Sequence, residues 1–170
     1  MIEYLAERTA QHIKRVVPHH PSSTAVLTYA LSIVINITSI ILVTMLLSML
    51  LGTFGRAMLI MFSFAVLRQF TGGYHLKTGM ACVWFSSLLF VALSMVTLPS
   101  IYCIILTCMS MMLILCYAPS HLAKHSRIPE TYYPLLKIVG CCLVAINLYV
   151  LSVPVALAFF VQSASLIRRR

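Results

Sequence analysis

A cysteine and a histidine lie close together in the one polar, glycine-rich stretch that interrupts the apolar sequence, residues 68–82. Cys82 follows His75 by seven positions. A thiol attacks a carbonyl carbon as the thiolate, and a nearby imidazole can take up its proton. The two residue types therefore predict nucleophilic catalysis, with Cys82 as the nucleophile and His75 as its proton partner. The alternative for His75 is a structural histidine at a membrane interface.

The start of a helix is predicted just before Cys82. Thr78 can serve as the N-cap of a helix that begins near Gly79 and continues into the apolar run 80–98. Cys82 would then lie in the first turn or just past it. The positive end of the helix dipole favours a thiolate at this place.

The spacing of the pair limits how the backbone can run. On one straight helix, His75 and Cys82 would be separated by roughly 10.5 Å along the axis, at about 1.5 Å per residue. Direct proton transfer needs about 2.6–3.2 Å between heavy atoms, or one bridging water. The catalytic hypothesis therefore forbids a straight helix between them. Gly72, Gly73 and Gly79 permit a bend, because glycine adopts positive φ without strain.

The composition places the chain in a membrane. Of its 170 residues, 61% are apolar and 9% are charged, and the mean hydropathy is +1.01. Soluble domains carry about 25% charged residues. We therefore expect an all-α, polytopic membrane helix bundle with about six hydrophobic segments, some short or re-entrant. It would form one integral membrane domain over residues 1–170, with an amphipathic helix and turn at 1–23 and a transmembrane bundle at 24–167.

The hydrophobic segments differ in length. They are 25–51, 57–67, 80–98, 101–118 and 138–167. A crossing takes about 20 residues, so 57–67 is a compressed span, a tilted half-helix or a re-entrant segment. Pro154 divides 138–167 into a hairpin of two short helices or one kinked helix. The link of two residues between 80–98 and 101–118 predicts an antiparallel pair.

The charges predict an orientation and a set of partners. The net charge is +9, and the N-terminal segment, the 119–137 loop and the C-terminus are basic. Positive loops favour the cytoplasmic side, so both termini and the 68–79 loop are expected there. Basic charge at this face suits anionic lipids and an acidic substrate. Nucleic acid is not expected, because no basic stripe with interleaved aromatic residues is present.

The acidic residues exclude several classes of enzyme. They are Glu3, Glu7 and Glu130, and the chain contains no Asp. Aspartyl dyads, Ser-His-Asp triads and paired-carboxylate glycosidases are therefore excluded. Residues 2–17 carry two of these acids among apolar positions, which predicts an amphipathic helix on the membrane surface or a short solvated helix.

Other residues that could do chemistry have simpler explanations. His121 and His125 are four apart, as in a helical metal pair, but flanking prolines and the lack of further ligands argue against a metal site. No metal or cofactor is expected. The five cysteines besides Cys82 lie in apolar runs, where cysteine packs as a small hydrophobic residue.

Several of these residues together resemble a known family. The series Arg68, Gly72-Gly73-Tyr74-His75 and Cys82, followed by an apolar span, resembles the AgrB family of membrane cysteine endopeptidases. The later Tyr117-Ala118-Pro119 and its basic loop resemble the segment after the central spans of that family.

The resemblance implies roles for individual residues. Cys82 would be the nucleophile and His75 the base. Other positions would shape the loop or orient the substrate, namely Arg68, Gly72 and Gly73. Gln69 and Ser86 are candidates for orienting His75, because no Asp or Asn stands near it in the sequence.

The resemblance also implies a substrate and partners. Such enzymes cleave an AgrD-like precursor peptide with an acidic C-terminal tail at the cytoplasmic side of the bacterial cell membrane. The acyl-thioester then yields a cyclic thiolactone or lactone autoinducer for quorum sensing, and a homodimer is expected. The competing hypothesis is a membrane transporter or adaptor without enzymatic activity.

Overall fold

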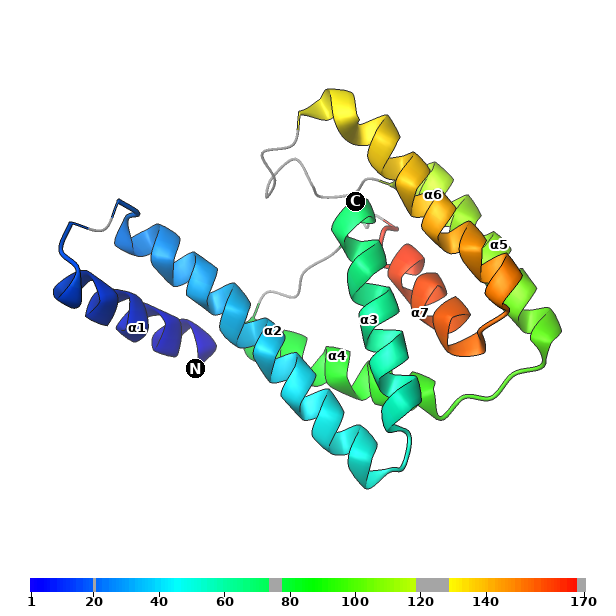
Figure 1. The fold of residues 1–170 in the computed structure, drawn as a ribbon, viewed down its shortest axis with the longest axis horizontal. Coiled ribbons are helices and arrows are strands. Elements are labelled where there is room, and N and C mark those ends of the chain that lie inside the picture. The colour runs from blue at the N-terminus through cyan, green and yellow to red at the C-terminus, as the bar shows by residue number, and fades with distance from the viewer. Residues whose placement is uncertain (20, 74–77, 119–128, 168–170) are drawn as a thin grey trace.

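The computed structural model describes residues 1–19, 21–73, 78–118 and 129–167 (Figure 1). Within these ranges the chain is all-helical, which confirms the predicted class of membrane helix bundle. The helices are α1 (Ile2–Val16), α2 (Thr24–Leu50), α3 (Phe54–Thr71), α4 (Gly79–Ser94), α5 (Ser100–Tyr117), the 3₁₀ turn η2 (Glu130–Tyr132), α6 (Tyr133–Val150) and α7 (Val153–Ala164). In the described part of the chain, α2, α5 and α6 are long and apolar enough to cross a membrane, and α4 and α7 are shorter apolar helices.

The first two helices form a hairpin (Figure 1). Ile2, Ala6 and Ala10 recur every four residues, so they lie on one face of α1, and all three are buried. The small alanine side chains allow a close approach to α2. Most charged residues of α1 are exposed, namely Glu3, Glu7, Arg8 and Arg15, as expected for an amphipathic helix.

Helix α7 lies at the centre of the remaining helices. One apolar cluster joins it to α3, α5 and α6 through residues that include Leu67, Ile114, Val144 and Phe159. A second cluster joins it to α3 and α4 through Ile60, Phe90 and Ala158. The end of α7 therefore lies beside the end of α3 (Figure 1).

Two of the expected segments have different bounds. The short segment 57–67 is part of α3, an 18-residue helix that includes Arg68 and continues to Thr71. Nothing before Gly72 breaks the helix, and Gly72 ends it with a φ of 73°. The expected segment 57–67 is therefore the central part of a longer helix, and α3 is not among the described helices that are long and apolar enough to cross a membrane.

The run 138–167 forms a hairpin of two helices, one of the two arrangements expected. The chain turns at Leu151, which has a φ of 53°, and Pro154 lies in the first turn of α7. Helix α6 begins at Tyr133, so residues 133–137 are helical and do not belong to a loop. Pro134 is compatible with this start, because the first turn of a helix does not need its N–H.

The expected antiparallel pair of 80–98 and 101–118 is not formed. Helix α4 ends at Ser94 and packs mainly against α2, whereas α5 packs against α6 and α7 (Figure 1). The connector is longer than the two residues expected. Residues 95–99 can reach up to about 16 Å when extended, so the two helices need not be neighbours.

Candidate active site

Cys82 is the fourth residue of α4, and the start of this helix is built as the sequence predicts. Thr78 is extended and its hydroxyl accepts a hydrogen bond of 3.4 Å from the Ala81 N–H. The Cys82 N–H donates to the Thr78 carbonyl at 3.1 Å. Because α4 begins at Gly79, a continuous helix from His75 to Cys82 is excluded.

The thiol of Cys82 is inside the bundle. Its residue is 7% exposed, and Sγ lies 3.9 Å from the hydroxyl oxygen of Ser86, one turn further along α4. Ser86 is therefore a partner of the Cys82 thiol within α4. His75 lies outside the described residues, so its relation to Cys82 and Ser86 stays a prediction.

Arg68 lies in the last turn of α3. Its guanidinium lies 5.8 Å from the centre of the Phe64 ring, and that ring packs edge-on against Phe90 of α4, the helix that carries Cys82. Gln69, the next residue, is exposed, so α3 turns Arg68 and Gln69 to different surroundings.

The two glycines after α3 have backbone conformations that favour glycine. Gly72 has a φ of 73° and Gly73 a φ of 138°. The Gly72 N–H donates to the Arg68 carbonyl at 2.9 Å and closes the helix. A Cβ on Gly73 would lie 2.9 Å from the hydroxyl oxygen of Ser165. Both positions therefore favour glycine, and the role of these glycines in shaping the loop that follows stays a prediction.

A buried glutamine of α7, which the sequence analysis missed, holds this turn. Gln162 is 0% exposed, and its Nε2 donates to the Thr71 hydroxyl at 3.1 Å and to the Gly72 carbonyl at 2.6 Å. Gln162 and Asn147 are the two amide side chains in the apolar run 138–167. A buried amide needs hydrogen-bond partners, so an amide side chain within an apolar run was the signal that could have identified Gln162.

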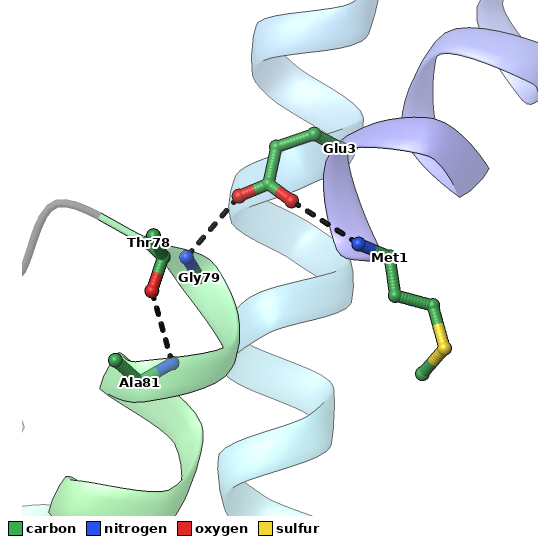
Figure 2. Close-up of polar contacts among 5 residues, drawn as sticks. All are labelled: Met1, Glu3, Thr78, Gly79 and Ala81. Atoms are coloured by element: carbon green, nitrogen blue, oxygen red, sulfur yellow. Dashed lines mark hydrogen bonds and ion pairs between the residues drawn. The ribbon is translucent and has the colours of Figure 1, made fainter.

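The start of α4 is also held from α1, which was not expected (Figure 2). The Glu3 carboxylate accepts a hydrogen bond of 3.2 Å from the Gly79 N–H and lies 3.6 Å from the Met1 ammonium. Hydrogen bonds from its own backbone N–H and from that of Gly79 hold the pKa of Glu3 below its usual value. A carboxylate at a helix N-terminus is favourable because it meets the positive end of the dipole.

The remaining histidines and cysteines form no metal centre among the residues described. No group of three His, Cys, Asp or Glu side chains is close enough to hold an ion there. His121 and His125 lie outside the described residues. Cys103 is buried, whereas Cys108, Cys116 and Cys142 are exposed on helices of the bundle. Cys103 therefore packs inside the protein, whereas the three exposed cysteines lie on outer faces of α5 and α6.

The comparison with known proteins agrees with the resemblance seen in the sequence. Residues 6–168 match the family described as Accessory gene regulator B (AgrB). No curated protein and no solved structure matches the chain. The match includes α3, α4 and the whole stretch that carries Arg68, His75 and Cys82. Because it covers nearly the entire chain, the protein belongs to the AgrB family.

Proposed function

We propose that this protein is a membrane cysteine endopeptidase that cleaves an AgrD-type precursor peptide through an acyl-thioester on Cys82. Family membership supports a role in autoinducer processing and a precursor of this type as the partner. The observation that carries the proposed chemistry is the place of Cys82 in the first turn of α4, a helix capped by Thr78. The positive end of the helix dipole favours negative charge at this place.

The proposed reaction has two steps. His75 takes the proton of Cys82, and the thiolate attacks the scissile carbonyl carbon of the precursor. The C–N bond then breaks, and the protonated His75 gives its proton to the leaving amine. The N-terminal part of the precursor stays bound to Sγ as a thioester. A Cys or Ser side chain of that peptide then attacks the thioester, releases the Cys82 thiol and closes a thiolactone or lactone ring.

The burial of Cys82 suits such an intermediate. A thioester that persists until an internal nucleophile attacks must be kept from water, and the residue is 7% exposed. We further propose that the site lies at the cytoplasmic side of a multi-pass bacterial membrane protein. The net charge of +9 favours a precursor with an acidic tail. A homodimer is part of the same proposal.

The decisive experiment is cleavage of a co-expressed AgrD-type precursor with an acidic tail. Cys82→Ala and His75→Ala should each abolish cleavage while the protein stays in the membrane. Cys142→Ala, which removes an exposed thiol of α6, should cleave normally and serves as the control. Mass spectrometry of the wild type should find the acyl group on the peptide that contains Cys82.

The same variants test the competing hypothesis. A transporter or adaptor would keep its function when Cys82 is replaced by Ser, and no acyl-enzyme would form. Cleavage of the precursor by Cys82→Ala at the rate of the wild type would end the proposal of cysteine catalysis.

A further inference from the structure

The side chain of Gln162 is the polar contact that joins α7 to the end of α3. Its Nε2 is 3.1 Å from the Thr71 hydroxyl and 2.6 Å from the Gly72 carbonyl oxygen. Its Oε1 lies 3.4 Å from the Ser165 hydroxyl. Gln162 and Thr71 are both 0% exposed. The contact is therefore shielded from solvent, where an unpaired polar group is costly.

The geometry requires an amide at this position. The Gly72 carbonyl can only accept, so the atom facing it must be a donor, and Nε2 has two N–H groups for the two acceptors. A carboxylate would place oxygen against the carbonyl oxygen. An apolar side chain would leave the part-buried carbonyl without this donor.

Thr71 is also fixed from a second helix. Its hydroxyl donates to the Leu67 carbonyl at 2.9 Å, one turn back in α3. A Cβ on Gly140 of α6 would lie 3.1 Å from the Thr71 methyl group, so the backbone of α6 approaches the threonine closely. The last turn of α3 thus has its orientation set by α6 on one side and by Gln162 on the other.

The same turn carries Arg68, whose carbonyl accepts the N–H of Gly72 at 2.9 Å. The Arg68 guanidinium lies 5.8 Å from the centre of the Phe64 ring, which packs against Phe90 of α4, the helix that carries Cys82. Gln162 donates a hydrogen bond to the carbonyl of the same Gly72. A shift of the turn at Gly72 would therefore move Arg68 relative to the sulfur.

We propose that Gln162 is a positioning residue for the reaction at Cys82: by holding Thr71 and Gly72, it fixes the last turn of α3 and its Arg68 relative to α4 and its thiol. The inference rests on the proposed function. It adds a residue of α7, which is separated from Cys82 in the sequence by α5 and α6, to the machinery that prepares the nucleophile.

The test replaces Gln162 with methionine, which is similar in length and has no N–H donor. In full-length protein in proteoliposomes, kcat for the precursor should fall by about 10- to 100-fold, the effect of misplacing a reacting group by about 1 Å. KM should change little, because the precursor still binds. At pH 7, alkylation of Cys82 by iodoacetamide should slow by a similar factor relative to alkylation of Cys142 in the same molecules.

The matched control is Asn147→Leu. Asn147 is 1% exposed and bonds to Thr107 and Ser152 at the turn between α6 and α7. Losing this second buried amide should lower stability but leave kcat and the labelling of Cys82 unchanged. If both variants reduced kcat and labelling equally, Gln162 would act through general stability and the inference would be wrong.

Thr71→Val keeps the experiment decisive if Gln162→Met fails to accumulate in the membrane. It removes one acceptor of Gln162 and keeps the shape of the side chain, so a smaller fall in kcat and in Cys82 labelling is expected. A wild-type kcat for this variant would then overturn the inference. The proposed function fails separately, if Cys82→Ala still cleaves the precursor. An inactive Cys82→Ala beside a fully active Gln162→Met would refute only the role of Gln162.

Discussion

Replacing Glu3 with alanine should loosen the first turn of α4, although the two residues in contact are far apart in the sequence. The Glu3 carboxylate accepts the Gly79 N–H at 3.2 Å (Figure 2). The substitution removes both the hydrogen bond and the negative charge at the positive end of α4. Because Cys82 lies in the same turn, this contact links α1 to the surroundings of the Cys82 thiol.

The expected loss of stability in the first turn of α4 follows from the exposure of Glu3 and the length of its hydrogen bond. The side chain of Glu3 is 62% exposed, so its charge at the helix end contributes about 0.5 kcal/mol, within the range for exposed sites. The hydrogen bond is long for a charged acceptor and adds about 0.5 kcal/mol. The sum of about 1 kcal/mol corresponds to a roughly fivefold change in an opening equilibrium.

The assay is amide hydrogen exchange in detergent, followed at Gly79, Ala81 and Cys82. Glu3→Ala should raise their exchange rates about fivefold at pH 7, in line with the 1 kcal/mol above. Glu7→Ala is the control, because it removes the same charge from α1 one turn away, where the carboxylate bonds to Gln11. Unchanged exchange in Glu3→Ala, or an equal rise in Glu7→Ala, would refute the reasoning.

Two further predictions use the same region. The pKa of Glu3 is lowered in the folded protein. The stabilisation by its contact with Gly79 is therefore fully present above the unfolded pKa, near 4.5, and is lost as pH falls through the lower folded pKa. Protection of the first turn of α4 from hydrogen exchange should fall in the same pH range, and this pH dependence should be absent in Glu3→Gln. Gly73→Ala should reduce precursor cleavage at least tenfold. The φ of Gly73 is 138° and the new Cβ would lie 2.9 Å from the Ser165 hydroxyl, which together correspond to a strain of about 1–3 kcal/mol. The control Gly55→Ala should cleave as the wild type does, because a Cβ at Gly55 meets nothing within 4 Å.

The start of α4 was predictable because its signals are local. Thr78 followed by Gly79 and an apolar run identifies an N-cap from side-chain chemistry alone. The hydroxyl of Thr78 accepts from Ala81, three residues away. The composition was equally direct, since so few charged residues leave only a membrane bundle. These features need no knowledge of which helices are neighbours.

The contacts that hold the site could not be predicted in this way. Gln162 and Thr71 are 91 residues apart in the sequence, and Glu3 and Gly79 are 76 apart. In a chain whose helices are apolar on most faces, periodicity does not identify which faces meet. The wrong pairing of α4 with α5 has the same cause, because a short connector was taken as evidence of contact.

The order of synthesis gives a further consequence to the hydrogen bonds of Gln162 with Thr71 and Gly72. Gln162 lies on α7, the last helix in the described part of the chain, whereas Cys82 and Arg68 are synthesised earlier. A partly synthesised chain would therefore contain the thiol and the guanidinium before the amide that bonds to Thr71 and Gly72. Under the proposed function, cleavage would begin only after α7 has packed against α3.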